Sequence, residues 1–399
     1  MANKWNKQRL GDVCEINQSK RGNNWKHPII EYIDISSVGV GHFVDKPNII
    51  SINEAPSRAQ RLVQDGDTIV STVRPNRRSM LYIKSPKPNT VVSTGFAVLH
   101  PKKIDSRFLY YSVFDQEFTY YLTARADGSA YPAVSPEVIS DAELDLPSLS
   151  EQRAIAGILG ALDDKIEVNR RMNATLESMA RTVFRQWFVE NEEVDDWEVG
   201  RLGDVIKVNE RGISKDYPYS EIEYIDISSV TTGRLENITP YSLSDVPSRA
   251  KRLVKHGDTI WSTVRPNRKS YLYISNPKDN LIVSTGFAVL TPEKIPPSYL
   301  YLLTTTDSFV DYLVSNADGS AYPAVGAERF ADAEVLLPPK DVLDKFENIV
   351  GIMLFRIAHN EKESRTLGSL RDSLLPKLMR GEVRVKDVGE KDSTQRSKA

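Results

Sequence analysis

Residues 55–83 read APSRAQRLVQDGDTIVSTVRPNRRSMLYI, and residues 246–274 read VPSRAKRLVKHGDTIWSTVRPNRKSYLYI. Of these 29 aligned positions, 22 are identical. Three further strings, EYIDISSV, VSTGFAVL and ADGSAYPAV, also occur twice, each 191 or 192 residues apart. The 399-residue chain is therefore one unit of about 191 residues written twice. A period this long is too large for a solenoid, so it indicates two copies of a whole domain.

The first three quarters of each copy has the pattern of a strand-rich domain. Short β-branched and aromatic runs such as TIVSTV and VVSTGFAVL alternate with Pro, Gly and Asn, which predicts strands joined by turns. One helix is expected within the strands, over residues 108–122, with Asp105 or Ser106 as its N-cap. Its counterpart is expected to begin after Pro296 and Pro297. The fold class of each such half is α+β.

Each copy ends in a long helical segment whose seam residues are alternately four and three positions apart, which is typical of a coiled coil. Such a helix of about 38 residues would be roughly 57 Å long. Neither helix can bury a seam alone, so we expect the two to pair. The seam positions are Ile155, Leu159, Leu162, Ile166, Asn169, Asn173, Leu176, Ala180, Val183 and Trp187, and then Phe346, Val350, Met353, Ile357, Asn360, Ser364, Leu367, Arg371, Leu374 and Leu378.

Asn169 and Asn360 occupy equivalent positions near the middle of the two helices. In an antiparallel pair they would meet close to the centre, where a buried amide pair can fix the register. The alternative is that each Asn faces water, and the pattern does not decide between the two. Antiparallel pairing would also relate the two strand-rich domains by a pseudo-two-fold axis.

The composition describes an ordinary globular chain with an uneven charge distribution. The 52 Lys and Arg residues nearly balance 54 Asp and Glu, for a net charge of −2. Residues 55–90 carry +5 and residues 246–281 carry +6, so the remainder carries −13. Basic windows of this kind attract phosphate, and an acidic remainder limits non-specific binding.

The same composition excludes several classes of protein. No apolar run approaches the roughly 20 residues of a membrane-spanning helix, and the first ten residues do not resemble a signal peptide. A single cysteine, Cys14, excludes a disulfide framework and a multi-cysteine zinc site, and we expect it to be a small core residue. We expect a cytoplasmic protein that does not associate with a membrane.

Two proline-containing turns are the first candidates for contacts to DNA. RPNRR at residues 74–78 and RPNRK at residues 265–269 each lie between two predicted strands. Arginine can bridge guanine O6 and N7, and asparagine can pair with adenine. The alternative is that these side chains contact only phosphate, or pair with acids of the fold. The candidate DNA-binding residues of the turns are Arg74, Asn76, Arg77 and Arg78, with Arg265, Asn267, Arg268 and Lys269.

The repeated string ADGSAYPAV provides a second set of candidates. Its Gly and Ser allow close approach of the backbone, and its Tyr could reach a base edge or a sugar; core packing of the Tyr is the alternative. Arg58 and Arg61, three residues apart, are expected to contact phosphate together with their copies. We expect Phe96 and Phe287 in the core and Asp67 and Asp258 in structural turns. The remaining candidate DNA-binding residues are Ser129, Tyr131, Ser320 and Tyr322 in the loops, and Arg58, Arg61, Arg249 and Arg252.

Motifs for catalysis are missing from the sequence. There is no GxxxxGK[ST] phosphate loop, and the five histidines show no metal-ligand spacing. IPPSY at residues 295–299 lacks the polar first residue of the Asn/Asp-Pro-Pro-aromatic motif of DNA methyltransferases. We therefore expect a chain that is not itself an enzyme, with no catalytic residue and no metal site.

The helical segments resemble a known family. Residues 146–189, LPSLSEQRAIAGILGALDDKIEVNRRMNATLESMARTVFRQWFV, are similar to the central conserved region of the specificity (S) subunits of type I restriction–modification systems. Residues 338–383 are similar to the distal conserved region of the same subunits, including its LRDSLLPKL and GE. Together with STVRPNRR, GFAVL and GSAYPAV, the resemblance covers essentially the whole chain.

The resemblance implies a division of the chain into two target recognition domains and two helices. The two ends of the repeat should lie close together, because the last helix points back to the first domain. The expected parts are a target recognition domain at 1–147, the central conserved helix at 148–189, a second target recognition domain at 190–338, the distal conserved helix at 339–385, and a disordered polar tail at 386–399.

The resemblance also implies the partners and the cofactors. The helices would act as a spacer and would dock two methyltransferase (M) subunits, with restriction (R) subunits completing the complex on double-stranded DNA. Adenine methylation with S-adenosylmethionine, and translocation and cleavage with ATP and Mg, would take place in those partners. No cofactor is expected on this chain itself.

The expected function is to read a bipartite, nearly palindromic DNA site. Two nearly identical readers related by a two-fold axis should read similar half-sites in opposite orientation, within about 17 base pairs for a 57 Å helix. Deviations from palindromy are expected where the copies differ, as at Val70 against Trp261, Met80 against Tyr271, and residues 39–54 against 231–245. The alternatives are a specificity component of a system with fused methylase and nuclease, or a coiled-coil scaffold that does not bind DNA.

Overall fold

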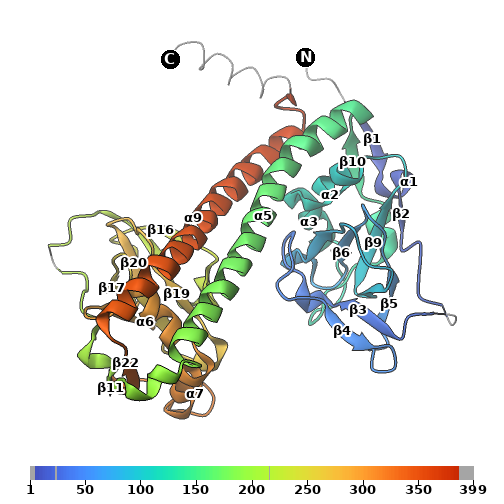
Figure 1. Cartoon of the computed structure of the whole chain (residues 1–399). Helices are drawn as coiled ribbons and strands as arrows, with labels where there is room; N and C mark the ends of the chain where they lie inside the picture. The colour runs from blue at the N-terminus through green and yellow to red at the C-terminus, as the bar shows by residue number, and fades with distance from the viewer. Residues whose placement is uncertain (1–4, 23–24, 215, 386–399) are drawn as a thin grey trace, which may run out of the picture. The chain divides into compact units, whose positions relative to one another are not determined.

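The computed structural model describes residues 5–22, 25–214 and 216–385, and the tail expected at 386–399 lies outside the described residues. The chain forms two compact units, Met1–Glu167 with Arg365–Ala399, and Val168–Ser364. Each unit contains one strand-rich domain and one half of each long helix (Figure 1). The chain therefore divides within both long helices, whereas the boundaries expected from the sequence lie at the helix ends.

The strand-rich domain of unit 1 is built on two four-stranded sheets. The first sheet is antiparallel, and the second contains one parallel pair, β3 with β8. A two-stranded sheet, β1 with β10, joins the two ends of the domain. The strands, in sheet order, are β2 (Cys14–Ile16), β9 (Phe96–Pro101), β6 (Thr68–Ser71) and β7 (Met80–Tyr82); β4 (Asn48–Ser51), β3 (Ile29–Ile33), β8 (Thr90–Ser93) and β5 (Ala59–Leu62); and β1 (Asn6–Arg9) with β10 (Glu143–Leu146).

Unit 2 repeats this arrangement strand for strand. It adds one short hairpin, β14 (Val230–Thr231) with β15 (Arg234–Leu235), in the region where the two copies differ in length. The equivalent sheets are β12 (Ile206–Val208), β21 (Phe287–Pro292), β18 (Thr259–Ser262) and β19 (Tyr271–Tyr273); β16 (Thr239–Ser242), β13 (Glu221–Ile225), β20 (Leu281–Ser284) and β17 (Ala250–Leu253); and β11 (Glu198–Arg201) with β22 (Glu334–Leu337).

Two helices, not one, interrupt the strands of each domain, so the expectation of a single helix over 108–122 is wrong. Asp115 lies between the helices with φ −58° and ψ 141°, and its side chain accepts the N–H of Glu117, which starts a new helix. Asp105 is the N-cap of the first helix, where it accepts the N–H groups of Arg107 and Phe108. The helices are α2 (Ser106–Phe114) and α3 (Gln116–Thr123), and in unit 2 α6 (Pro297–Thr304) and α7 (Asp307–Ser315); the short helices are α1 (Leu10–Val13), α4 (Pro136–Ser140) and α8 (Ala327–Asp332).

Residues expected in the core are indeed buried. Phe96 and Phe287 are fully buried, which confirms that expectation. The pairs Val70/Trp261 and Met80/Tyr271 are also at most 2% exposed. Because these four side chains lie in the cores of their domains, they are not placed to contact DNA directly. Deviations from palindromy where the copies differ remain a prediction.

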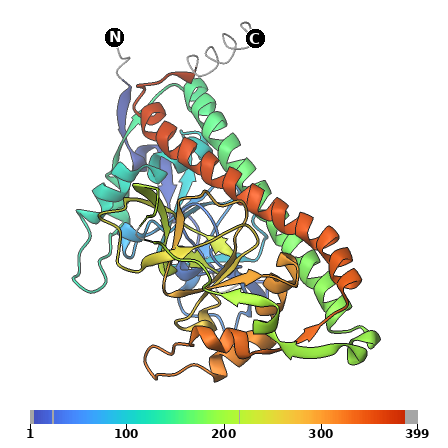
Figure 2. The same cartoon turned by 90° about the vertical axis from the view of Figure 1, so that its left-hand side faces the viewer.

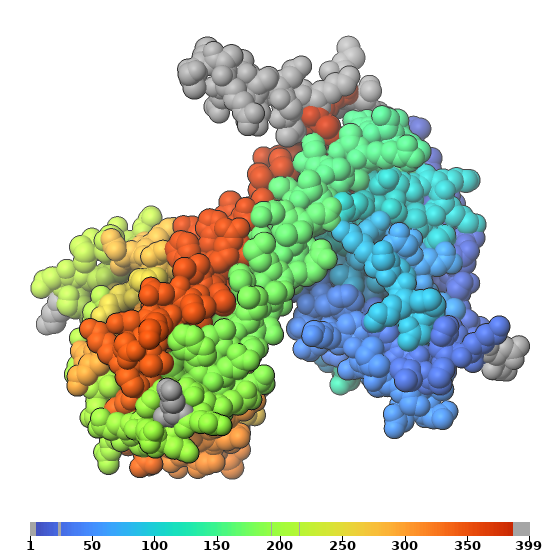
Figure 3. Space-filling view, viewed as in Figure 1, coloured from blue at the N-terminus to red at the C-terminus, as the bar shows by residue number. Residues whose placement is uncertain are grey.

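The long helices α5 (Leu149–Phe188) and α9 (Lys340–Met379) pack side by side in each unit, as Figures 1, 2 and 3 show. All twenty seam residues are buried or half-buried. In unit 1, Ile155 near the start of α5 shares a hydrophobic core with Leu378 near the end of α9. In unit 2, Phe184 near the end of α5 shares a core with Phe346 near the start of α9. The helices are therefore antiparallel, as expected.

The two ends of the repeat meet in unit 1. Trp5, Val383 and Val385 pack against the same hydrophobic core. Gly381 has a positive φ of 67°, and a Cβ atom there would lie 3.2 Å from the Trp5 ring. This close approach confirms that the last helix returns to the first domain.

Candidate nucleic-acid interface

The two RPN turns, defined here as residues 74–78 and 265–269, have the same backbone in both copies. Each contains a short 3₁₀ helix between two strands of the antiparallel sheet, as the sequence predicted. Arg74 and Arg78 have φ values of 50° and 55°, and Arg265 and Lys269 have 52° and 54°. Left-handed backbone is costly for residues other than glycine, so the surroundings must hold this shape, and such strain concentrates at functional sites.

The tyrosine loops, residues 126–134 and 317–325, lie against the RPN turns. The Arg74 N–H donates to the Pro132 carbonyl over 2.7 Å, and the Arg265 N–H donates to the Pro323 carbonyl over the same distance. The Arg74 guanidinium lies 4.4 Å from the Tyr131 ring centroid. The structure thus brings the two sets of sequence candidates together at one place on each domain.

Tyr131 and Tyr322 lie on the surface. Their exposed fractions are 69% and 70%, so core packing, the alternative left open by the sequence, is wrong for both. Ser129 and Ser320 in the same loops are exposed as well. At the tips of the RPN turns, Asn76 and Arg77 are exposed, as are their copies Asn267 and Arg268. Each domain therefore presents an arginine, an amide and a tyrosine ring on one surface.

The last residue of each RPN turn faces its own domain. Arg78 is half-buried and donates to the Phe114 carbonyl over 2.5 Å, and burial lowers the pKa of its guanidinium. Lys269 forms an ion pair with Asp307 over 2.7 Å. The Lys269 contact matches the alternative in which a basic residue of the turn pairs with an acid of the fold, whereas Arg78 contacts a backbone carbonyl. Contact of either residue with DNA remains a prediction.

The four arginines expected at phosphates divide into two groups. Arg61 donates to the Asn17 side chain and the Phe96 carbonyl, Arg252 donates to the Thr285 carbonyl over 3.3 Å, and burial lowers the pKa of both guanidinium groups. This placement favours a structural role for both. Arg58 and Arg249 are exposed instead, and Arg58 lies 3.4 Å from a carboxylate oxygen of Asp34. They are the surface cations of this group.

Asp67, Asp258 and Cys14 have structural environments, as expected. Asp67 is buried and accepts hydrogen bonds from the Gln64 N–H and the His100 ring, each over 2.7 Å. Asp258 accepts the Lys255 N–H and the Thr291 hydroxyl, and burial raises the pKa of both carboxyl groups. Burial also raises the pKa of the Cys14 thiol to about 12, which makes it unreactive.

Within the described residues, no cluster of three or more His, Cys, Asp or Glu side chains could hold a metal ion. None of the helices in the described part of the chain is long and apolar enough to cross a membrane.

Asn169 and Asn360 are fully buried and in contact, so the water-facing alternative is wrong. The Asn169 amide donates to the Asn360 carbonyl over 3.3 Å and to Glu363 over 2.8 Å. The Asn360 amide donates to the Asn173 side chain over 2.8 Å. The side-chain oxygens of Asn169 and Asn360 have no hydrogen-bond partner among the described residues, which is a cost in stability. A role in fixing the register remains a prediction.

Sequence reasoning missed two polar contacts of unit 1, one between the strand-rich domain and α5 and one between α5 and α9. Arg107 of α2 binds Asp164 of α5 through two hydrogen bonds, of 2.9 and 2.6 Å. This contact is the main reason that the pKa of Asp164 falls to about 2. Arg371 on α9 donates to Asp163 on α5 over 2.6 Å. An arginine at a seam position was the one signal in the sequence that could have indicated such a contact.

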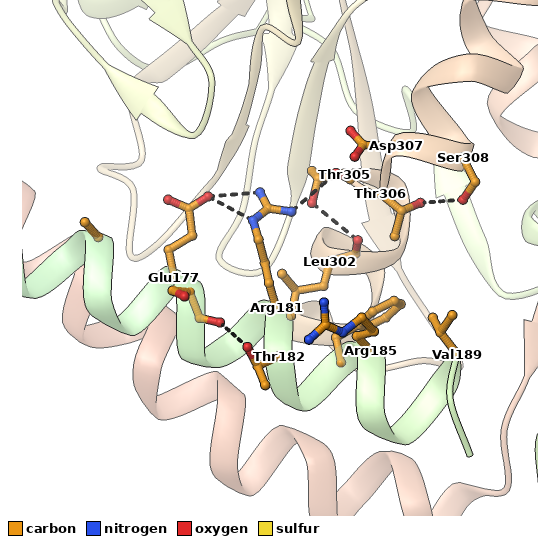
Figure 4. Close-up of a pocket in the computed structure, with 13 residues that line it drawn as sticks. Glu177, Arg181, Thr182, Arg185, Val189, Leu302, Thr305, Thr306, Asp307 and Ser308 are labelled. Carbon is orange, nitrogen blue, oxygen red and sulfur yellow. Dashed lines mark hydrogen bonds and ion pairs between the residues drawn. The ribbon is translucent and has the colours of Figure 1, made fainter. Parts of the chain in front are cut away.

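Unit 2 has a cleft of about 740 Å³ between α5 and the junction of α6 with α7. Figure 4 shows Arg181 reaching from α5 to Glu177 and to the carbonyl of Thr305. Asp307, the partner of Lys269 in the RPN turn, lines the same cleft. The cleft thus lies beside Lys269, the last residue of the second RPN turn.

Comparison with known proteins gives the same picture. The chain is 24% identical to the type I restriction enzyme HindI specificity subunit of Haemophilus influenzae, over 95% of this chain and 99% of that protein. It is 25% identical to the MjaIX specificity subunit of Methanocaldococcus jannaschii, over 78% of this chain and 77% of that one. The fold resembles the crystal structure of a type I restriction–modification S subunit from M. genitalium, with a TM-score of 0.55, 16% identity and coverage of 94% and 96%.

The family model that describes the type I restriction modification DNA specificity domain matches the chain twice, at residues 2–178 and 194–352. The two matches coincide with the two copies of the repeat and cover most of the chain. This protein therefore belongs to the type I restriction modification DNA specificity family, as one of its specificity subunits.

Proposed function

We propose that each strand-rich domain reads one half of a bipartite DNA site with its RPN turn and tyrosine loop. The observation that carries this proposal is the duplicated arginine–tyrosine contact: 4.4 Å between Arg74 and the Tyr131 ring, and 4.3 Å between Arg265 and the Tyr322 ring. Two surfaces of the same chemistry, each on a rigid turn, are what a bipartite reader needs. The two half-sites would then be recognised independently, each by one of two domains that belong to the same chain.

The chemistry of the turn suits the edges of bases. Asn76 and Arg77 stand exposed at its tip, and arginine and asparagine discriminate guanine and adenine by about 1–3 kcal/mol for each bidentate pair. The backbone of the turn is fixed at both ends, so little conformational freedom is lost when DNA binds. Arg58 is placed to contribute phosphate attraction, which positions the domain without reading sequence.

The two half-sites should be nearly the same sequence in opposite orientation. The RPN turns differ only at Arg78 and Lys269, and both of these side chains are held within their own domains. Each long helix has 40 residues and so spans about 60 Å, which corresponds to about 18 base pairs of DNA. This length is our upper limit for the whole site.

The helices would dock two methyltransferase subunits, and restriction subunits would complete the complex. Exposed apolar residues on α9 support a protein-binding face, because exposed apolar patches mark interaction surfaces: Ile352 is 67% and Phe355 is 50% exposed. This chain would be non-catalytic and cytoplasmic. S-adenosylmethionine, ATP and Mg would be used by the partners.

The experiment that tests this function is DNA binding by the purified chain together with its methyltransferase partner. We expect an affinity that falls steeply with salt and is much higher for one bipartite sequence than for random duplexes. A chain that assembles with the methyltransferase but leaves its DNA selectivity unchanged would be a scaffold, and the proposal would be wrong.

A further inference from the structure

In unit 1 the ring of Phe114 lies between two arginines from different parts of the fold. Arg78, at the end of the RPN turn, lies 5.1 Å from the ring centroid, and Arg371 on α9 lies 4.7 Å from it. Arg78 also donates to the Phe114 carbonyl over 2.5 Å. The end of the RPN turn is thus linked to the long helix through one aromatic side chain.

Arg371 is itself held firmly. Its guanidinium donates to Asp163 on α5 over 2.6 Å, and Asp163 also accepts the Tyr111 hydroxyl over 2.7 Å. The side chains of Arg371 and Asp163 are only 15% and 21% exposed. A planar guanidinium fixed in this way is a rigid support, because its departure would leave the Asp163 carboxylate without its cationic partner.

In unit 2 a different set of residues makes the equivalent link. Arg181 on α5 donates to the hydroxyl of Tyr271 over 3.0 Å and to Glu177 over 2.9 Å. Tyr271 begins strand β19, two residues after the RPN turn ends. Lys269, the last residue of the turn, pairs with Asp307. In both units, the supporting arginine comes from the C-terminal half of a long helix.

The contacts between the RPN turn and the long helix are less tightly packed in unit 2 than in unit 1. Thr305 occupies the place of Phe114 in the repeat, and the cleft of about 740 Å³ opens beside it (Figure 4). Lys269 and Asp307 are 41% and 87% exposed, so salt and water screen their attraction. The first RPN turn is therefore held by packed groups, and the second by an exposed ion pair and one half-buried arginine.

We propose that Arg371 and Arg181 are positioning residues for DNA reading. Each holds the RPN turn of its own domain on a long helix and thereby sets the fidelity with which that domain reads its half-site, without touching DNA. This inference rests on the proposed function, because it assumes that the RPN turns are the readers. A strained turn that must place base-reading side chains accurately needs such external support. The screened link of unit 2 makes the second domain the less stringent reader.

The test uses the full chain assembled with its methyltransferase partner and measures methylation of duplexes that carry one changed base pair in one half-site. The variants are Asp163→Asn with Arg371→Met, and Glu177→Gln with Arg181→Met. Each removes both partners of a contact, so that no buried charge is left unpaired. Arg74→Ala and Arg265→Ala assign each half-site to its domain.

For the first pair of substitutions we expect selectivity at the half-site of the first domain to fall about tenfold, with the other half-site unchanged. The second pair should give the reverse result. The salt dependence of DNA affinity should stay the same, because no phosphate contact is lost. In the unaltered protein, raising the salt concentration should relax selectivity more at the second half-site than at the first.

Two arginines of similar position serve as matched controls. Arg185 lies one helical turn after Arg181, and the Arg185→Met variant loses an exposed ion pair with Glu190. The Arg380→Met variant loses an exposed ion pair with Glu117. Neither residue contacts an RPN turn among the interactions of the described residues, so both variants should keep full selectivity. Arg371→Lys keeps a cation beside Asp163 and should restore part of the lost selectivity.

Equal loss at both half-sites, or no loss in a variant that melts like the unaltered protein, would overturn the inference. If a double variant fails to fold, the selectivity of the Arg371→Lys variant tests the inference instead. Full selectivity of that variant at the first half-site would contradict a positioning role for the planar guanidinium. Failure of the proposed function gives a different result, because Arg74→Ala and Arg265→Ala would then leave selectivity intact at both half-sites.

Discussion

The Arg74 guanidinium lies over the ring of Tyr131, 4.4 Å from its centroid, and Arg265 lies over Tyr322 at 4.3 Å. Each contact joins two segments that are more than 50 residues apart in the chain, the RPN turn and the tyrosine loop. One NH2 group of each guanidinium donates to the tyrosine loop, from Arg74 to the Ala130 carbonyl over 3.4 Å and from Arg265 to the Ala321 carbonyl over 3.2 Å. The stacked guanidinium keeps its remaining N–H groups for a base edge while losing conformational freedom. Each domain thus presents a preorganised arginine at its surface.

Replacing Arg74 and Arg265 together by Ala should abolish sequence-specific DNA binding. Each arginine is expected to contribute about 1–3 kcal/mol of discrimination if it pairs with guanine. Fluorescence anisotropy with cognate and random duplexes measures the loss, and co-purification with the methyltransferase subunit shows that assembly is intact. Arg185→Ala, which removes an exposed arginine elsewhere on the chain, is the control. Unchanged methylation of the cognate site would refute the role of both arginines.

Substitutions of Tyr131 separate the roles of its ring and its hydroxyl. Tyr131→Phe keeps the ring under Arg74 and should retain cognate affinity, whereas Tyr131→Ala should weaken it by roughly 0.5–1 kcal/mol, the range for an exposed cation–π contact. Titration calorimetry with the cognate duplex measures both. Equal loss in the two variants would show that the hydroxyl, and not the stacked arginine, carries the contact.

Asp164 should make the stability of unit 1 depend on pH in the acid range. Its pKa is lowered to about 2, chiefly by the hydrogen bonds from Arg107, from an ordinary value of 3.8. Because the folded-state pKa is the lower one, the contribution is complete above about pH 4 and is lost as the pH falls through about 2. The side chain is 47% exposed, so solvent screening limits the contribution to under about 1 kcal/mol.

The measurement is thermal unfolding of Asp164→Asn beside the unaltered protein between pH 7 and pH 2. The variant should melt at a lower temperature at pH 7, and the difference should close as the pH approaches 2. Asp341→Asn removes an exposed i,i+4 contact to Lys345 on α9 and is the control. A difference that stayed constant with pH would show that the Asp164 carboxylate is not the cause.

Replacing Asn169 and Asn360 together by Leu should raise the free energy of unfolding. It should also make the pairing of the two long helices less specific, so that chains associate with one another. Both side-chain oxygens are buried without a partner among the described residues, and a polar residue in a coiled-coil seam fixes register at a cost in stability. We expect a gain of about 1 kcal/mol in thermal unfolding, together with oligomers detected by light scattering. A less stable variant that remains homogeneous would contradict this role.

The repeat, the strands, the paired helices and the RPN turns could be predicted because their signals lie close together in the sequence. The break between α2 and α3 at Asp115 was missed because Phe114 and Phe118, on either side of it, are spaced as apolar residues of one continuous helix would be. Its copy, Thr306, is also a capping residue, and that shared property was the available signal. The local sequence pattern thus predicted which helices and strands form, but not where one helix ends and the next begins.

The roles of individual arginines depend on partners that sequence spacing does not reveal. Arg61 and Arg78 lie in the most basic windows and so resemble DNA contacts, but their partners Phe96 and Phe114 are 35 and 36 residues away. Charge density indicated which windows of each domain are basic, but not which of their arginines are exposed. Only the folded chain distinguishes an arginine that faces outward, such as Arg77, from one that supports the turn beneath it.

The most direct test of a two-copy reader is a map of methylated adenines in cells that carry this chain and its methyltransferase partner. The structure predicts one bipartite motif of at most about 18 base pairs, whose two half-sequences are nearly identical in inverted orientation. Arg265→Ala should relax one half of that motif and leave the other unchanged. Two unrelated half-sequences, or a single continuous motif, would contradict the account.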